Sequence, residues 1–458
     1  MPRAGQVKPQ VVERLSDRIA IGVLTSTFPP ELVDRVVAEA GRTEQRERLL
    51  PARVVVYLLL AGCLFAELGY GQVWQRLTAG LDGLQLATPT ASALTQARRR
   101  LGPAPLRALF GLLCGPAPVA ATGGVRVGGL LVCAIDGTTL SVADTPANLG
   151  VYAKQPGHHG GSGYPLLRLV ALVACATRSL IDVVFGPTSS GETTMTSQLT
   201  QHLHAGMLVL CDRNLTTAAL AGRIATTGAH LLGRCKANRQ LPLVGRLPDG
   251  SWLSLLGGVT VRVVDAEIII ATRAGRVSSS YRLATTLTDA HSWPAAALVA
   301  LYHQRWEIET AYLELKSSIL GGRVLRARTP QGVDQEVHAL LVCYQLLRLA
   351  MADATSTQPG IDPDRASFTV ALNTARDQLI QAAGVIASTT IDLVGKIGRA
   401  VLDNLLTDRR LRVSPRVVKR AISKYNARGP TINRTSYKAT LSIDILASPT
   451  RLTTSAGP

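Results

Sequence analysis

Two apolar segments that each run directly into an aspartate place the strongest constraint on the fold of this chain. LLVCAID ends at Asp136 and MLVLCD ends at Asp212, and both have the length and composition of buried strands in an α/β sheet. Functional side chains of open α/β sheets lie at such strand ends, where the chain leaves the core. A carboxylate buried without a partner is costly, so each Asp should lie at an exposed strand end or bind a cation.

A later segment, YHQRWEIETAYLELK, contains no Pro or Gly and predicts one helix, Tyr302–Lys316, of about four turns. At about 100° per residue, one narrow stripe of this helix carries an aromatic ring, two cations and a carboxylate: Tyr302, Arg305, Glu309 and Lys316. Glu307 and Glu314 point to the opposite side. The stripe could grip phosphate beside a metal ion, or it could be a solvated face whose charges support one another at helical spacing.

Asp136, Asp212 and Glu309 together would form a site of hard oxygen ligands, which Mg²⁺ and Mn²⁺ prefer. Two such ions roughly 3.5–4 Å apart would activate the attacking oxygen and stabilise the leaving oxygen of a phosphoryl transfer. Each Asp alone also has a structural explanation, because Asp after a strand often opens a turn or caps a helix. The combination, with cations on the same helix face as Glu309, favours the catalytic interpretation.

The order of these features resembles the DDE transposases of the insertion-sequence-four group. The shared features are a strand with Asp, a second strand with Asp, a β-rich insert, and a helix with the pattern Y-x2-R-x3-E-x6-K. AIDGTTL and LVLCDRNL resemble the segments around the two Asp residues of the family, and the resemblance spans roughly Pro29 to Ala354. It implies an α/β fold: a ribonuclease H-like mixed sheet flanked by helices, interrupted by a β-rich insert, with helical N- and C-terminal domains.

The resemblance also implies roles for individual residues. Asp136, Asp212 and Glu309 would hold two Mg²⁺ or Mn²⁺ ions. Arg305 and Lys316 would contact phosphates near the scissile bond, and Tyr302 would contact DNA backbone or base. The implied partner is double-stranded DNA, both the terminal inverted repeats of the element and the target, held by a homodimer in a synapse. Related members cleave DNA through a hairpin intermediate.

Three regions are expected along the chain. Residues 1–120 form a helical N-terminal domain with possible DNA binding, and residues 121–350 form the catalytic domain, with a β insert at about 240–292. Residues 351–458 form a basic, helical C-terminal region. Its segment 409–438 holds ten Lys and Arg and no Asp or Glu, with two interleaved tyrosines. That segment is either a solvated or disordered face or a set of phosphate contacts.

Composition agrees with a nucleic-acid partner. The 49 Lys and Arg against 31 Asp and Glu give a formal charge of +18. Such an excess favours nucleic acid first and an anionic membrane second, although a generally basic proteome gives the same balance. Seven scattered cysteines are typical of buried apolar side chains in a reducing compartment. The longest apolar run, Val54–Ala66, is too short to cross a bilayer, so we expect a bacterial cytoplasmic, nucleoid-associated protein without membrane contact.

Several further residues have weaker signals. Asp182 lies in an alternating strand pattern and Glu192 at a predicted helix start, so neither is expected to be a catalytic acid. The pair His158-His159 lacks an evident third metal ligand, and Trp306 is expected to pack against the protein. The remaining candidates are basic residues that could touch DNA: Lys154, Arg168 and the cluster Arg98–Arg100. That cluster also suits the C-terminal end of a helix.

The sequence therefore predicts a DNA transposase that binds the ends of its element and performs metal-dependent cleavage and strand transfer. Water would attack first, and the released 3′-hydroxyl would then act as nucleophile and finally join target DNA. Two alternatives stay open: a catalytically silent, domesticated DNA-binding protein, and a ribonuclease H-like nuclease without strand transfer.

Overall fold

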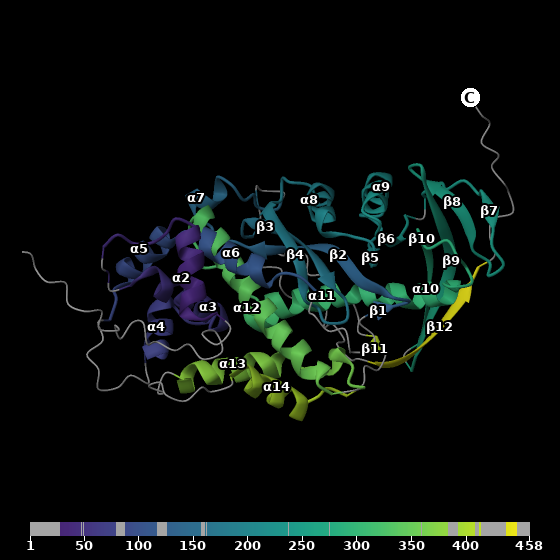
Figure 1. Ribbon diagram of the computed structural model, residues 1–458. Coiled ribbons are helices and arrows are strands. Elements are labelled where there is room, and N and C mark those ends of the chain that lie inside the picture. Colours follow the sequence, from purple (N-terminus) through teal and green to yellow (C-terminus); the bar gives the residue numbers. More distant parts are fainter. Residues whose placement is uncertain are drawn as a thin grey trace, which may run out of the picture.

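A mixed β-sheet with helices on both faces forms the centre of the protein (Figure 1). The computed structural model describes residues 28–446 except 47, 49, 79–87, 117–125, 157–160, 162, 237, 274, 359, 383–392, 408–411 and 414–436. His158-His159 and most of the basic segment 409–438 therefore lie outside the described residues.

The core of the sheet has the strand order β4-β3-β2-β5-β6. β3 runs antiparallel between β2 and β4, whereas β5 and then β6 run parallel to β2. This is the ribonuclease H-like arrangement, and the predicted fold class is confirmed. The bounds of the five strands are Leu130–Ser141 for β2, Leu166–Ala174 for β3, Leu180–Pro187 for β4, Met207–Cys211 for β5 and His230–Arg234 for β6.

Both faces of this core are buried, which explains why the strands read as continuous apolar runs. Along β2, Leu131, Cys133 and Ile135 pack on one side, in the hydrophobic cluster that includes α8 (Glu192–Leu199) and α9 (Ala218–Thr226). The alternate residues Val132 and Ala134 belong to the cluster on the other side, with α10 to α12. Glu192 is at a helix start, as predicted.

The β insert extends the sheet instead of forming a separate layer. β10 pairs with β6, and β9 pairs with β10. β12 from the C-terminal region then pairs with β9, so residues far apart in the chain lie side by side at this edge (Figure 1). The strands at this edge are β7 Gly245–Arg246, β8 Trp252–Leu256, β9 Val259–Thr272, β10 Gly275–Thr285, β11 Arg412–Val413 and β12 Tyr437–Ile445. The short strand β1, Arg126–Val127, pairs instead with β2.

The C-terminal region is only partly helical. α13 (Phe368–Ala382) and α14 (Leu393–Asp403) agree with the expectation, but β12 does not. Its sequence, YKATLSIDI, alternates between apolar and polar residues over its second half, which is a strand signal that the helical expectation passed over. β12 is stable as a strand because β9 supplies an edge to pair with.

The predicted helix Tyr302–Lys316 is part of a longer, composite helical segment. α10 (Ala295–Tyr302) comes first, followed by a 3-10 turn, α11 (Trp306–Leu313) and a π-helical turn, Glu314–Ile319. The prediction of a single uniform helix was therefore wrong at both ends. A 3-10 turn and a π turn change the rotation per residue, so the uniform 100° spacing does not hold across them.

The N-terminal helices share one hydrophobic core with α12 (Pro330–Ser356). α3 is buried along its length, as the apolar run predicted. In the described part of the chain, α12 alone is long and apolar enough to span a membrane, but 89% of its apolar window is buried inside the protein. The other helices and short turns are α2 Pro30–Glu39, α3 Ala52–Leu64, α4 Tyr70–Thr78, α5 Ala91–Leu101, α6 Ala104–Leu113 and α7 Pro146–Leu149.

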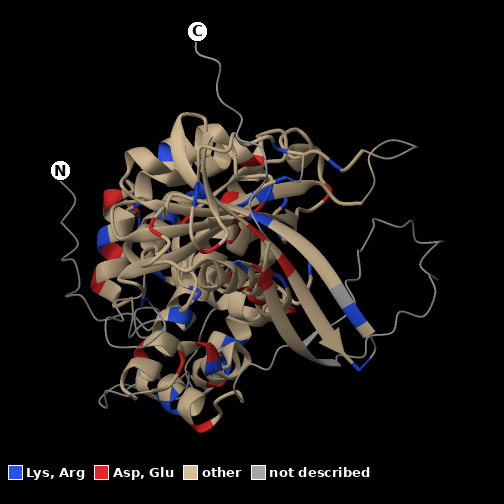
Figure 2. Cartoon of the chain, turned by 90° about the vertical axis from the view of Figure 1, so that its right-hand side faces the viewer, with Lys and Arg blue, Asp and Glu red and all other residues tan. Residues whose placement is uncertain are grey.

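The charged residues are spread through the structure, and the cysteines are mostly buried. Lys and Arg are spread over helices and strands with Asp and Glu among them (Figure 2). All seven cysteines are free, and only Cys114 is not fully buried. They are the small buried side chains that the sequence predicts.

Candidate active site

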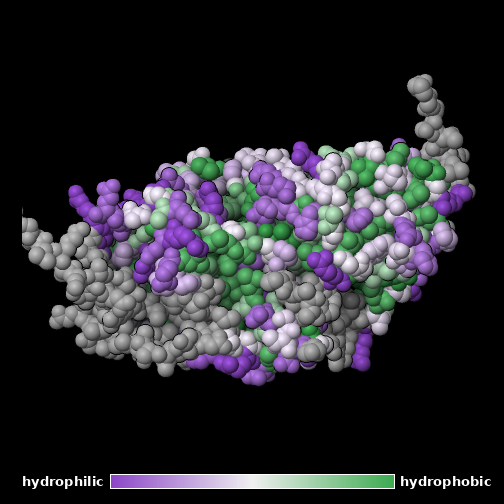
Figure 3. Space-filling view, viewed as in Figure 1, coloured by the Kyte–Doolittle hydropathy of each residue, from purple (hydrophilic) through white to green (hydrophobic). Residues whose placement is uncertain are grey.

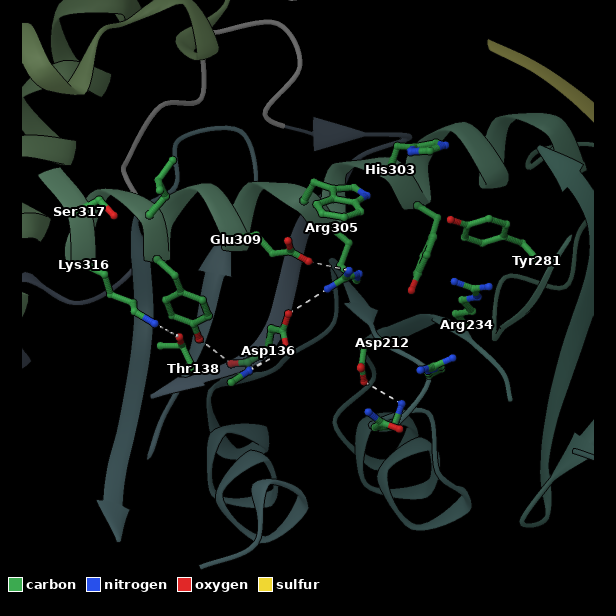
Figure 4. A pocket seen from close by; sticks show the side chains of 17 residues that line it. Asp136, Thr138, Asp212, Arg234, Tyr281, His303, Arg305, Glu309, Lys316 and Ser317 are labelled. Atoms are coloured by element: carbon green, nitrogen blue, oxygen red, sulfur yellow. Dashed lines mark hydrogen bonds and ion pairs between the residues drawn. The ribbon is translucent and has the colours of Figure 1, made fainter. Parts of the chain in front are cut away.

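The two strand-end aspartates are neighbours across the parallel pair β2 and β5. Ile135 lies opposite Cys211 in the register of these strands, so the next residues, Asp136 and Asp212, are adjacent positions. Ile135 and Cys211 both pack toward α8 and α9. Because side chains alternate along a strand, both carboxylates project to the opposite face, under α11 (Figure 4).

Glu309 reaches this point from α11, and Arg305 lies between the carboxylates. One guanidinium nitrogen of Arg305 is 2.9 Å from Asp136 Oδ2, and another is 3.1 Å from Glu309 Oε1 (Figure 4). The Glu309 side chain is 40% exposed, whereas the side chain of Asp136 is 19% exposed. A cation is therefore already stabilised between an acid of β2 and an acid of α11.

Asp212 is oriented by the turn that follows β5. Its Oδ1 accepts hydrogen bonds from the backbone N–H groups of Asn214 and Leu215, both at 2.8 Å. The strand end itself is fixed from α10, because the hydroxyl of Tyr302 donates to the carbonyl of Cys211 at 3.0 Å. The turn-forming role of Asp212 thus coexists with its place in the cavity.

The side chain of Asp136 is largely buried, at 19% exposure. Burial raises its pKa to about 6, although the N–H of Gly137 at 2.8 Å and the Arg305 guanidinium act in the opposite direction. The hydroxyl of Tyr312 donates to the Asp136 carbonyl at 2.6 Å and accepts from the N–H of Ala171 at 3.1 Å. These bonds tie β2, β3 and α11 together at the level of the carboxylate.

All six residues predicted for the site line one cavity of about 790 Å³, namely Asp136, Asp212, Tyr302, Arg305, Glu309 and Lys316. Lys316 Nζ donates to Thr138 Oγ1 at 3.2 Å, which brings this cation over β2 (Figure 4). The cavity holds groups that bind phosphate and groups that bind cations, which is what phosphoryl transfer requires.

Tyr302 differs from its predicted role. The sequence predicts a contact with DNA, but the side chain is only 6% exposed and its hydroxyl is bonded to the Cys211 carbonyl. Tyr302 ends α10, whereas Arg305 is the last residue of the 3-10 turn and Glu309 lies in α11. Tyr302 positions the end of β5 instead of presenting an exposed ring.

Sequence reasoning missed three residues of the site. Tyr312 stands one turn from Glu309 and could have been found by helical spacing. Arg234 stacks over the ring of Tyr281 at 3.9 Å, and both line the same cavity. Arg234 lies on β6, and Tyr281 lies on β10 of the insert, which pairs with β6. No local pattern in the sequence predicts that these two strands are neighbours.

The weaker candidates have local structural partners. Asp182 lies 2.9 Å from His202, and Lys154 pairs with Asp144 at 2.5 Å. Arg168 donates to the carbonyls of Thr188 and Ser190 and thereby holds the loop before α8. Trp306 is 48% exposed, so the expectation that it packs against the protein was wrong.

The opposite face of the same helical segment carries a second, sealed cluster of charge. Arg178 Nε lies 2.5 Å from Glu307, and the same guanidinium also pairs with Glu314 and Asp364. Arg348 pairs with Glu314 from α12. Among the described residues other than Gly, Arg178 alone has a positive φ, 55°, a conformation that the surrounding contacts must enforce.

The donor set fits a hard divalent cation. Asp136, Asp212 and Glu309 offer only carboxylate oxygen, the ligand type that Mg²⁺ and Mn²⁺ prefer. In the part of the chain that the structure describes, no three His, Cys, Asp or Glu side chains are close enough to bind a metal ion without rearrangement. In this arrangement Arg305 bridges Asp136 and Glu309.

A ribonuclease H-like sheet whose two strand-end aspartates face a glutamate on a helix defines the class of DDE enzymes that process DNA. Two family descriptions match the chain: "Insertion element 4 transposase N-terminal" over residues 18–111 and "Transposase DDE domain" over residues 128–346. The chain belongs to the insertion-sequence-four family of DDE transposases, and it is a DNA transposase.

Two relatives and one solved structure are similar to the chain. The chain is 28% identical over 439 residues to the transposase InsG for insertion sequence element IS4 of Escherichia coli K12, covering 92% of this chain and 97% of the relative. It is 25% identical over 188 residues to the putative transposase InsZ of the same strain, covering 41% and 61%. A solved piggyBac transposase synaptic complex with hairpin DNA has a TM-score of 0.46 and 10% identity, covering 86% of this chain and 88% of that one.

Proposed function

We propose that this transposase cuts and joins DNA with divalent metal ions held by Asp136, Asp212 and Glu309. One observation carries the proposal: two adjacent strand-end carboxylates and a helix-borne carboxylate line one cavity together with cations. Two ions, Mg²⁺ or Mn²⁺, would supply Lewis-acid stabilisation of the attacking and leaving oxygens. The family generally uses divalent ions, and the three-acid oxygen set of this chain fits that chemistry.

The cationic side chains of the cavity have separate tasks in this proposal. Arg305, which pairs with Asp136 at 2.9 Å, would direct its guanidinium to the phosphate to be cut. Lys316, now bonded to Thr138, neutralises charge on the phosphate near the scissile bond. Tyr302 positions Asp212 through the backbone of Cys211 and does not touch DNA.

The substrates would be the terminal inverted repeats of the element and a target duplex, brought together by a homodimer in the cytoplasm. The reaction begins when water attacks a strand at the element end and releases a 3′-hydroxyl. That hydroxyl then serves as the nucleophile that joins target DNA. The family assignment does not favour a silent DNA-binding protein or a nuclease without strand transfer.

The test is a reaction with the flanking terminal repeats, Mg²⁺ and a target plasmid. Wild-type protein should give joined DNA, whereas hydrolysed ends alone would indicate a nuclease. Glu309→Gln should bind the ends with unchanged affinity and lose cleavage by roughly 10³-fold or more. Asp403→Asn, on the exposed surface of α14, is the matched control and should cleave like wild type. Persistent cleavage by Glu309→Gln would overturn the assignment.

A further inference from the structure

A second cavity, of about 370 Å³, lies where α5 of the N-terminal helices meets the start of α12. The described residues that line it include no Asp or Glu, and four of them are arginines: Arg98, Arg99, Arg326 and Arg328. Two come from the end of α5, and two come from the connection between the catalytic helix and α12. We name these four residues and the space between them the arginine cavity.

One of the four arginines is fully engaged with the protein. Arg326 pairs with Glu336 at 3.3 Å and donates to the carbonyls of Gly62 at 2.7 Å and Leu68 at 2.9 Å. These bonds anchor the connection before α12 to the N-terminal helices. Arg326 therefore lines the cavity as a structural residue, and Glu336 neutralises its charge.

The other three arginines carry charge that the described residues do not balance. Arg98 stacks on the ring of Tyr70 at 4.2 Å, and its buried Nε has no hydrogen-bond partner among the described residues. Arg99 and Arg328 are exposed, and no ion pair of either is found in the described part of the chain. The third arginine of the α5 cluster, Arg100, is instead neutralised by Glu44 at 3.2 Å.

The backbone around the cavity is held in place from several directions. Thr145 Oγ1 donates to the carbonyl of Arg328 at 2.9 Å, and Asn148 Nδ2 donates to the carbonyl of Ala327 at 3.0 Å. Gln335 joins the two walls, because its amide donates to the carbonyls of Arg98 at 3.1 Å and Gly102 at 2.8 Å. A ligand would therefore meet a preorganised backbone.

The chemistry of this cavity suits a phosphate. Guanidinium groups bind phosphate oxygens with paired N–H donors, and like charges gathered without a carboxylate gain stability when an anion joins them. Strongly hydrophilic side chains gather over this end of the molecule, around α5 and α7 (Figure 3). Because Arg99 and Arg328 are exposed at its edge, a phosphate on an extended backbone fits better than a small, enclosed anion.

We propose that the arginine cavity binds a backbone phosphate of the duplex DNA on which the active site works. The cavity lies on the connection that directly follows the catalytic helix, and the N–H of Leu325 in that connection donates to the carbonyl of Ser141 on β2 at 2.9 Å. A phosphate held there fixes the DNA relative to the strand that carries Asp136. This inference rests on the proposed function, since it requires DNA as substrate.

The test compares the double variant Arg99→Gln/Arg328→Gln with Arg223→Gln/Arg399→Gln, which removes the same charge from exposed positions on α9 and α14. The affinity of the full-length protein for an element-end duplex is measured across a series of salt concentrations. The first variant should bind more weakly, with a salt dependence shallower by about 1 for the one lost phosphate contact. The second should match wild type.

Equal affinity and equal salt dependence of the two double variants would overturn the inference. It would also be overturned if Arg99→Gln/Arg328→Gln lost only thermal stabilisation by inorganic phosphate, because the cavity would then hold a small anion and not DNA. The control variant Arg223→Gln/Arg399→Gln should also cleave at the wild-type rate at saturating DNA. A failure of the proposed function appears separately, as absence of cleavage by wild-type protein.

Discussion

Two clusters of charge lie on opposite faces of one helical segment, and they differ in how completely the protein closes them. The open cluster, around Arg305, faces the 790 Å³ cavity, and its Glu309 is 40% exposed. The sealed cluster, around Arg178, buries its arginine to 4% exposure and pairs each of its carboxylates with an arginine. Both use the same residue types at helical spacing.

The difference indicates which carboxylates could bind a metal ion or substrate. In the sealed cluster, Glu307 and Glu314 are paired away from water, and Glu314 ties the helical segment to Arg348 of α12. Asp364 also pairs with Arg178, although its side chain is 21% exposed. In the open cluster, Asp136 and Glu309 share one arginine that solvent or substrate can reach. The acids that we propose as catalytic, Asp136 and Glu309, are those that share a single arginine.

The largest expected effect comes from breaking the sealed cluster. Arg178→Met leaves the buried carboxylates of Glu307 and Glu314 without this cation and should lower the free energy of unfolding by about 3–5 kcal/mol. Arg305→Met, the matched change in the open cluster, should lower it by no more than about 1 kcal/mol. Urea unfolding of both variants measures the contrast. Equal losses would show that the two clusters are energetically alike.

A smaller effect is expected from the pH dependence of the open cluster. Burial raises the pKa of Asp136 from its ordinary value of 3.8 to about 6. The folded protein therefore holds a proton that the unfolded chain releases, so this contribution to stability is complete below about pH 3.8 and is lost as the pH rises through about 6. In metal-free buffer, the free energy of unfolding of wild type should fall over that range relative to Asp136→Asn. Parallel pH curves would contradict the raised pKa.

The smallest effect is expected at Tyr302. Tyr302→Phe removes one hydrogen bond to the Cys211 carbonyl and should cost about 0.5–1.5 kcal/mol of unfolding free energy. Affinity for element-end DNA should stay unchanged, because the hydroxyl faces the backbone of β5 and not solvent. A large loss of DNA affinity with full stability would instead support the DNA contact that the sequence predicts.

The sequence was most informative where the function depends on local patterns. The apolar runs that end at Asp136 and Asp212 predict strand ends. An apolar run forms a buried strand, but a carboxylate buried without a partner is costly, so the strand should leave the core at the acid. The spacing of Arg305 and Glu309 predicts a shared face, and the two side chains form an ion pair between the end of the 3-10 turn and α11. The resemblance to a transposase family added the order in which these pieces occur.

Other features depend on contacts that no local pattern contains. The burial of Tyr302 was not predicted, because α10 packs against the insert and β12, which are distant in the sequence. β12 is a strand because β9 offers an edge more than 160 residues earlier in the chain. The pairing of Arg178 with Asp364, and the meeting of Arg99 with Arg328, likewise arise only when distant segments pack together.

The central claim, that the open carboxylates hold a divalent metal ion, is tested most directly by changing a ligand atom. Asp212→Cys replaces a hard oxygen with a thiolate, which favours softer ions than Mg²⁺. Cleavage of element-end DNA by this variant should be lost in Mg²⁺ and partly restored in Mn²⁺, while Asp403→Cys should behave like wild type with both ions. Cleavage by Asp212→Cys in Mg²⁺ at the wild-type rate would contradict the claim.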